Sequence, residues 1–220
     1  MPYEKKDRFH QRAKRENFAA RSVYKLEEID RRLSLFDKGA RIVDLGASPG
    51  SWMQYISRVI GKKGVVAGYD LEPAEVVPGP NASHEIASVD DLTPERVRRQ
   101  IAELVAKKKG TEVTEEPPPT FRIDGLVSDM APKLTGIRDA DQAKSVALAR
   151  QALLLSDVLV KEGGFFVAKL FQGRDADELI DEAKRIYKDV KLLKPEATRE
   201  GSREVFIIGR HKKTAPRATL

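Results

Sequence analysis

Cysteine is absent from this chain of 220 residues, and histidine and tryptophan are scarce. Without cysteine the protein can have no disulfide, no thiolate zinc site and no cysteine nucleophile, which fits an intracellular, cytoplasmic location. The three histidines, His10, His84 and His211, lie far apart in the sequence. We therefore expect no metal site built on histidine.

Long uncharged apolar runs are also missing. We expect no membrane span, and the charged residues 1–14 predict no secretory signal. Apolar residues make up 40% of the chain and charged residues 34%, which predicts one heavily charged domain. We expect this domain to be monomeric. High charge without cysteine also suits an archaeal or thermophilic source.

Positive charge is concentrated at the two ends of the chain. Residues 1–25 hold eight Lys or Arg and three Asp or Glu, and residues 210–220 hold four Lys or Arg and no acid. The formal net charge is +6, so the middle of the chain is slightly acidic, and the basic ends indicate contact with a polyanion. We divide the chain into a basic arm at 1–18, a folded domain at 19–210 and a solvated basic tail at 211–220.

The other elements of the chain are arranged around the stretch from Arg41 to Trp52. Its apolar run ends in a small-residue turn, and a helix is predicted from Ser51 to Val59. A strand, a glycine turn and a helix together expose backbone N–H groups beside a nucleotide-like ligand. The spacing is not G-x-G-x-x-G and the turn lacks the lysine of a phosphate loop, which argues against a dinucleotide or a triphosphate. This leaves a nucleoside ligand without a phosphate chain, most commonly S-adenosylmethionine, or a tight β–α turn with no ligand.

Apolar runs alternate with amphipathic segments along the chain, which predicts an α/β fold: an open, mostly parallel sheet with helices on both faces. The predicted strands are 42–45, 65–69, 84–89, 122–128, 165–171, 190–193 and 204–209, and the predicted helices are 20–36, 51–59, 94–109, 139–161 and 175–188.

Particular residues mark the ends of these elements. We expect Ser22 to cap the first helix, Gly39 to end that segment, and Thr93 to cap the third helix. The glycines at 163–164 are expected to break the long fourth helix. The proline-rich residues 110–120 predict a polar surface excursion, to which we assign no role.

Four aspartates, Asp44, Asp70, Asp91 and Asp129, fall at or just beyond the ends of predicted strands. Ligands of open α/β sheets bind outside the carboxyl ends of the strands, so the four acids favour a composite polar site. Asp70 is placed to accept hydrogen bonds from two ribose hydroxyls. A helix cap or a turn acid is the alternative interpretation of Asp70.

Lys169 interrupts an otherwise apolar predicted strand. A buried ammonium group costs several kcal/mol unless it is paired or deprotonated, so this lysine is either at an exposed strand end or functional. Glu204 opens the final strand and could be an ordinary polar strand start, and Asp129 could be a turn acid. These three residues become informative if they converge with each other and with Lys25.

Five motifs in the same order resemble the FtsJ (RrmJ-type, RlmE) family of S-adenosylmethionine-dependent RNA 2′-O-ribose methyltransferases, across roughly residues 12–209. They are Arg21-Ser22-Val23-Tyr24-Lys25-Leu26, the stretch from Val43 to Trp52, Ser128-Asp129-Met130-Ala131-Pro132, the stretch from Val167 to Gly173, and Ser202-Arg203-Glu204-Val205. The family usually has Ala-Pro-Gly-Gly where this chain has Ser48-Pro49-Gly50-Ser51, which keeps the residues small.

The resemblance implies a Rossmann-like class I methyltransferase fold and a role for each residue that matches a family motif. The implied catalytic set is Lys25, Asp129, Lys169 and Glu204. The implied contacts with S-adenosylmethionine are Gly50, Trp52, Asp70 and Asp129, with either Asp91 or Asp90, of which we prefer Asp91; no metal is implied. Lys169 is the candidate base, Lys25 would steer the ribose, and the two acids would orient the lysines.

The resemblance implies RNA as the partner and favours a uridine of large-subunit (23S) ribosomal RNA, free or within the large ribosomal subunit. The alternatives are a tRNA 2′-O-methyltransferase, a non-catalytic RNA-binding module of ribosome assembly, and a dehydrogenase of related fold, which the glycine spacing disfavours. The basic arm leads to Lys25, so its cations would contact phosphates beside the site. Phe9 and Phe18 could stack on bases, but we favour packing for both.

Overall fold

The computed structural model describes residues 8–173 and 175–214. Its strands are β1 (Arg41–Leu45), β2 (Val65–Asp70), β3 (Ala82–Ile86), β4 (Ile123–Ser128), β5 (Val160–Phe171), β6 (Tyr187–Leu193) and β7 (Glu204–Lys212). Its α-helices are α1 (Arg8–Arg15), α2 (Val23–Leu33), α3 (Ser51–Ile60), α4 (Pro94–Lys109), α5 (Arg138–Leu159) and α6 (Ala176–Ile186), with a single 3₁₀ turn, η1 (Val89–Asp91).

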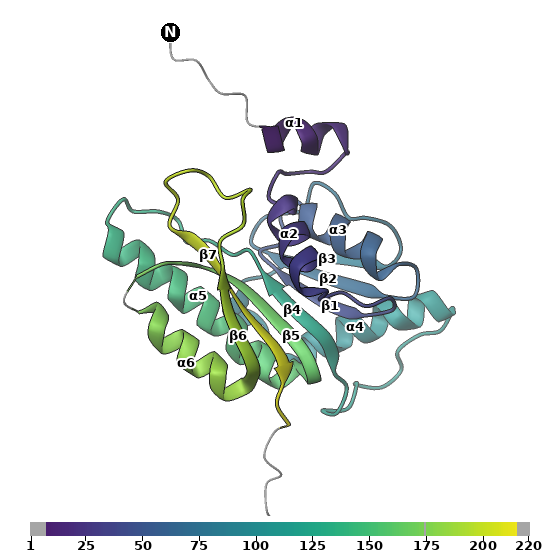
Figure 1. Cartoon of the computed structure of the whole chain (residues 1–220). Helices are drawn as coiled ribbons and strands as arrows, with labels where there is room; N and C mark the ends of the chain where they lie inside the picture. The colour runs from purple at the N-terminus through teal and green to yellow at the C-terminus, as the bar shows by residue number, and fades with distance from the viewer. Residues whose placement is uncertain (1–7, 174, 215–220) are drawn as a thin grey trace, which may run out of the picture.

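A seven-stranded sheet forms the centre of the molecule, in the order β3-β2-β1-β4-β5-β7-β6 (Figure 1). The pairs from β3 through β5 are all parallel, whereas β7 runs antiparallel to both β5 and β6. The prediction of an open, mostly parallel sheet is therefore confirmed. Because β7 is reversed, its first residue lies at the edge of the sheet where the parallel strands end.

Helices cover both faces of the sheet, as predicted. On one face, α2 and α3 pack their apolar side chains on Ile42, Val66 and Phe206. On the other face, α4, α5 and α6 pack on a second cluster that includes Val43 and Leu45. Neighbouring residues of one strand thus point to opposite faces, which is the period of two expected of a buried strand.

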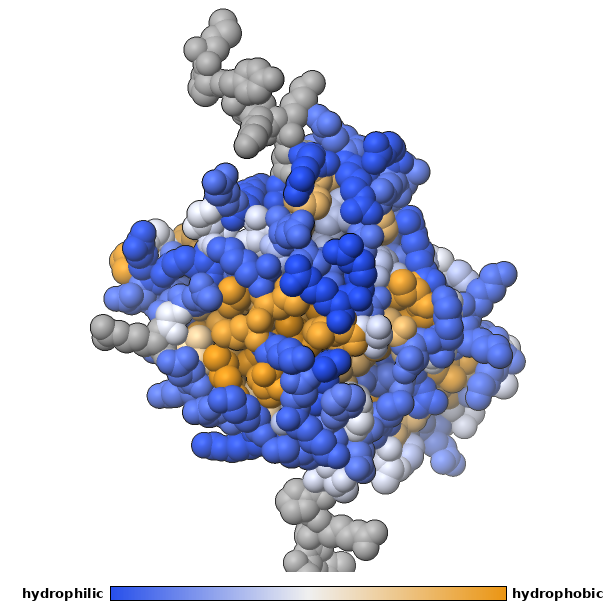
Figure 2. Space-filling model, in the orientation of Figure 1, coloured by the Kyte–Doolittle hydropathy of each residue, from blue (hydrophilic) through white to orange (hydrophobic). Residues whose placement is uncertain are grey.

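Hydrophilic residues cover most of the face seen in Figure 2, and apolar residues gather near its middle, over the β6 and β7 strands. Within the described ranges, no helix is both long enough and apolar enough to cross a membrane.

The first predicted helix begins and ends differently from the prediction. Ser22 precedes α2, but its side chain makes no capping hydrogen bond; its hydroxyl lies 3.0 Å from the Ser51 hydroxyl instead. The helix ends well before Gly39, because Ser34 adopts a left-handed conformation (φ 51°) and its N–H donates to the Asp30 carbonyl. Thr93, in contrast, caps α4 as predicted.

The third strand and the fourth helix end earlier than predicted. β3 spans residues 82–86 rather than 84–89, because its partner β2 ends at Asp70, which pairs with Ile86. α5 ends at Leu159, because Val160 is already extended and pairs with β4. The glycines at 163–164 consequently lie inside β5 instead of ending the helix.

The last strand is longer than predicted. β7 pairs with β6 as far as Lys212, three residues beyond the predicted end, so His211 and Lys212 belong to the sheet and not to a solvated tail. Lys212 is buried, and its ammonium group donates to the Val160 carbonyl at 3.0 Å. Burial lowers the pKa of this lysine.

Candidate active site

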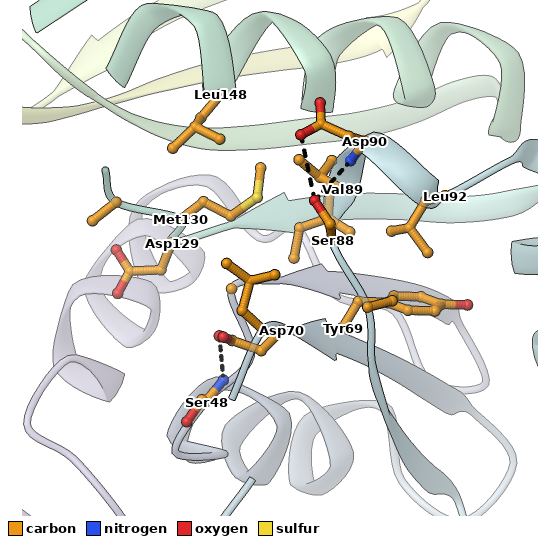
Figure 3. A pocket seen from close by; sticks show the side chains of 15 residues that line it. Ser48, Tyr69, Asp70, Ser88, Val89, Asp90, Leu92, Asp129, Met130 and Leu148 are labelled. Carbon is orange, nitrogen blue, oxygen red and sulfur yellow. Dashed lines mark hydrogen bonds between the residues drawn. The ribbon is translucent and has the colours of Figure 1, made fainter. Parts of the chain in front are cut away.

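A cavity of about 430 Å³ opens at the carboxyl ends of the parallel strands (Figure 3). This is the edge where an open α/β sheet binds its ligands. The volume lies in the range of small-molecule sites. The lining residues come from β1, β2, α5 and the segments that follow β1 to β4: Leu45, Gly46, Ser48, Tyr69, Asp70, Leu71, Ala87, Ser88, Val89, Asp90, Leu92, Asp129, Met130, Ala131 and Leu148.

Asp70 ends β2 and lines the cavity, as the sequence predicted. One carboxylate oxygen accepts from the Ser48 N–H at 2.9 Å, and the other accepts from the Glu72 N–H at 3.0 Å. Figure 3 shows the first of these bonds. Each oxygen retains capacity for a second hydrogen bond, so this oriented carboxylate can accept from two hydroxyls of a ribose.

The opposite wall of the cavity is apolar. Val89, Leu92, Met130 and Leu148 line it, and Figure 3 shows their side chains around the hollow. Sequence reasoning missed these four residues, because they come from separate segments that only the fold brings together. An apolar wall opposite a carboxylate suits a nucleoside, whose base is flat and whose sugar is polar.

Of the two adjacent aspartates after β3, Asp90 lines the cavity and Asp91 does not. The Asp90 carboxylate also accepts a hydrogen bond from the Gln151 side chain of α5. The geometry therefore favours Asp90 over Asp91, opposite to the preference drawn from the sequence.

Gly50 and Trp52 lie outside the residues that line the cavity. Gly50 has φ 113°, and a Cβ atom there would lie 2.1 Å from the Val76 carbonyl oxygen, so its close approach is to the protein's own backbone and not to a ligand. The Trp52 indole is buried; its N–H donates to the Ser22 carbonyl at 3.0 Å, and its ring packs on Phe206 with centroids 5.8 Å apart. The side chain of Trp52 thus supports α2.

Asp44 lies inside β1 and is completely buried. Neither of its carboxylate oxygens has a hydrogen-bond partner among the described residues. Burial raises the pKa of this carboxyl well above its ordinary value, and the nearby charges of Asp129 and Asp70 raise it further. This environment therefore favours the neutral, protonated form of the Asp44 carboxyl.

Lys169 and Asp129 form a buried ion pair. Ser128 of β4 pairs with Ala168 of β5, so the next residues along the two strands lie side by side. The Lys169 ammonium lies 2.8 Å from an Asp129 carboxylate oxygen and also donates to the Asp129 carbonyl. The Lys169 side chain is only 7% exposed, and this pairing offsets part of the cost of burying its charge.

Lys25 and Glu204 form a second ion pair. The Lys25 ammonium lies 2.6 Å from a Glu204 carboxylate oxygen, and both side chains are 13% exposed. Glu204 opens β7 and Lys25 lies in the first turn of α2. The ammonium also lies 5.9 Å above the Phe206 ring. The two ends of the domain therefore meet at this point.

The two pairs lie on one face of the sheet. Lys169 is directly opposite Phe206 in the β5–β7 register, and Glu204 is two residues from Phe206 along β7. Because side chains two residues apart share a face, all three point toward α2. The four residues predicted as a set thus come together, next to the cavity that Asp129 lines. Two amines beside an aspartate-lined cavity can hold and move protons there.

Further positive charge borders the second pair. The guanidinium of Arg21 donates to the Ala197 carbonyl at 2.5 Å in the segment between β6 and β7. Burial lowers the pKa of Arg21, and the nearby charge of Arg199 lowers it further, whereas Glu204 raises it. Sequence reasoning missed Arg199, because it lies far from α2 along the chain.

Comparison with known proteins gives a consistent result. The family model of FtsJ-like methyltransferases matches residues 18–212. The chain is 43% identical to the ribosomal RNA large subunit methyltransferase E of Bdellovibrio bacteriovorus, over 97% of this chain and all of that protein. It is 36% identical to the protein of the same name from Haloarcula marismortui, over 96% of this chain and 77% of that protein.

A solved structure shares the fold. It is described as a ribosomal RNA methyltransferase from Plasmodium falciparum, is 22% identical, and aligns with a TM-score of 0.69 over 89% of this chain and 98% of that chain. The likeness supports the class I methyltransferase arrangement predicted for the sheet.

The buried carboxyl of Asp44 predicts a pH-dependent effect on stability. In the unfolded chain this group ionises at its ordinary pKa, whereas in the folded protein its pKa is raised. Stability from this group is therefore present at acidic pH and is lost as pH rises through the folded pKa. We expect Asp44→Asn to become more stable relative to the native protein as pH rises from 4 to 8, by about 1.4 kcal/mol for each unit by which the pKa is raised.

Thermal unfolding of both proteins across this pH range measures the difference. The exposed Asp37 supplies the control variant Asp37→Asn, which should show no such trend. A difference between Asp44→Asn and the native protein that stays constant with pH would contradict a raised pKa.

Proposed function

The chain belongs to the FtsJ-like methyltransferase family, and from that premise we propose that it methylates a ribose 2′-oxygen in ribosomal RNA of the large subunit. It is an S-adenosylmethionine-dependent methyltransferase. The observation that supports this reaction most directly is the convergence of two lysine–carboxylate pairs beside the cavity.

The residues of the cavity fit S-adenosylmethionine. Asp70 would accept from the ribose hydroxyls, and Asp90 with the apolar wall would hold the adenine. Asp129 would lie between the cofactor and the reacting groups. Gly50 and Trp52 would contribute only backbone groups at the start of α3, since the Trp52 side chain is committed to α2. When bound, S-adenosylmethionine supplies an electrophilic methyl group attached to a sulfonium.

Lys169 acts on the nucleophile in this proposal. A ribose 2′-hydroxyl is a weak nucleophile and needs a base within hydrogen-bond reach. In its unprotonated form, Lys169 would accept the hydroxyl proton as that oxygen takes the methyl group, which would leave the sulfonium. Proper placement of the two reactants alone supplies up to about 7–11 kcal/mol of the barrier reduction.

The remaining three residues position the reacting groups and stabilise the charge that develops on the ribose oxygen. Asp129 holds the Lys169 amine through two contacts, and Glu204 holds Lys25. Lys25 steers the ribose and stabilises negative charge that develops on its oxygen. We further propose a monomeric, cytoplasmic enzyme; an archaeal source stays a prediction.

The RNA class is tested by incubation with methyl-labelled S-adenosylmethionine and three separate pools: large ribosomal subunits, protein-free ribosomal RNA, and tRNA. We expect label in ribosomal RNA, and none in tRNA. The label should resist alkaline hydrolysis, because a 2′-O-methyl group removes the hydroxyl that attacks the neighbouring phosphate. Label in tRNA alone would establish the alternative branch, and no label in any RNA would refute the proposal.

Removal of the candidate base should affect methyl transfer without affecting the binding of S-adenosylmethionine. We expect Lys169→Ala to bind S-adenosylmethionine with nearly native affinity, measured by calorimetry, and to lose at least about a hundredfold in methyl transfer. Lys161→Ala is a matched control, because Lys161 lies on the same strand at the opposite edge and makes a surface pair with Asp124. Near-native turnover by Lys169→Ala would exclude Lys169 as the base.

The arm before α2 is proposed to contact phosphates. Its aromatic residues pack as favoured from the sequence: the Phe9 and Phe18 rings lie 5.7 Å and 6.2 Å from the Tyr24 ring. Removing the arm would uncover this cluster, so substitution is the sharper test. Lys14 and Arg15 are exposed at the end of α1.

We expect Lys14→Gln with Arg15→Gln to weaken RNA binding and to reduce the slope of log affinity against log salt by about 1.4–1.8, since each lost phosphate contact contributes about 0.7–0.9. Filter binding at several salt concentrations measures this slope. Lys107→Gln with Lys109→Gln, at the far end of α4, is the control. An unchanged slope would show that the arm does not touch RNA.

A further inference from the structure

Two large apolar side chains are exposed in the segment that joins β4 to α5. Leu134 is 68% exposed and Ile137 is 66% exposed. Single exposed apolar residues are common and need no explanation. Here two of them stand in one six-residue segment, Lys133 to Arg138, which we name the β4–α5 ridge.

The ridge is held in a fixed shape by Asp141, the fourth residue of α5. The Asp141 carboxylate accepts from the Thr135 N–H at 2.7 Å, the Thr135 hydroxyl at 2.8 Å and the Gly136 N–H at 3.1 Å. These bonds lower the pKa of Asp141, so it stays ionised at neutral pH. These three bonds anchor the middle of the ridge to α5, with the apolar side chains of Leu134 and Ile137 exposed on either side.

The ridge lies close to the reacting groups along the chain. Leu134 follows Asp129 by five residues, which places it at most about 17 Å away. The first half of α5 is tied to the end of β5, because the Ser145 hydroxyl accepts from the Phe171 N–H at 3.1 Å. Lys169 lies two residues before Phe171. In Figure 1 the segment before α5 lies at the same edge of the sheet as α1 and the β6–β7 connection.

Positive charges flank the apolar pair. Lys133 and Arg138 are both exposed, and neither forms an ion pair with another described residue. An apolar surface between two cations is complementary to a nucleotide, which has a flat base and a charged phosphate on each side. An apolar patch on a partner protein, in contrast, carries no regular negative charge on each side for Lys133 and Arg138 to contact.

We propose that the β4–α5 ridge is a substrate-binding element that contacts RNA next to the methylated nucleotide, with Leu134 and Ile137 against a nucleobase and Lys133 and Arg138 toward its phosphates. This inference rests on the proposed function and adds to it the residues that hold the substrate on the side of the site away from α1.

The test is the affinity of the full-length protein for protein-free large-subunit ribosomal RNA, measured by filter binding, together with the KM for large ribosomal subunits. We expect Leu134→Ser with Ile137→Ser to weaken binding and raise KM by about tenfold. The factor should be the same at every salt concentration, because no phosphate contact is lost. Affinity for S-adenosylmethionine should not change.

Two further variants sharpen the result. Ile86→Ser, at a residue 61% exposed on β3, is a matched control and should bind RNA normally. Asp141→Asn should weaken RNA binding in the same direction while leaving cofactor affinity unchanged, because an amide has one acceptor oxygen where the carboxylate has two.

Native affinity of the double variant for protein-free RNA would overturn the inference. If that affinity is native and only the KM for large ribosomal subunits rises, the ridge contacts a ribosomal protein and not RNA. If the native protein itself neither binds nor methylates ribosomal RNA, the proposed function fails instead.

Discussion

The arrangement at the carboxyl edge of the sheet depends on the cost of burying charge. An ammonium group inside an apolar strand is costly, and a carboxylate beside it offsets part of that cost. Lys169 is therefore stabilised by Asp129, and this pairing constrains how β4 and β5 align. Glu204 and Lys25 obey the same rule between β7 and α2. The groups proposed for chemistry are thus the same groups that fix the relative positions of four elements.

Much of the fold could be predicted because buried parallel strands are continuous apolar runs bounded by turn residues. Six of the seven strands were found within a few residues of their positions, although β5 begins five residues earlier than predicted. The predictions that failed depended on tertiary partners. β3 stops where β2 stops, and β7 continues because β6 lies beside it. Ser22 does not cap α2, because its hydroxyl pairs with Ser51 across the domain.

The candidate site was predictable for residues whose type conflicts with their surroundings. Lys169 and Glu204 stood out because charge interrupts apolar sequence, and the structure pairs each with another member of the set of four. Residues that are ordinary in their local context gave no such signal. Asp90 and Asp91 differ only in which way a 3₁₀ turn directs them, and Leu148 is one of many leucines of α5. The Trp52 side chain supports the core, which its position beside a glycine turn did not reveal.

The reversal of β7 has a consequence for the order in which the parts of the site are synthesised. The cavity is built from residues between Leu45 and Leu148, which emerge from the ribosome well before the last strand. Glu204 is the first residue of β7, the last strand to be synthesised. This strand lies between β5 and β6 in the sheet. The residues that line the cavity are therefore synthesised before the carboxylate that pairs with Lys25, so the two parts of the site come from different stages of synthesis.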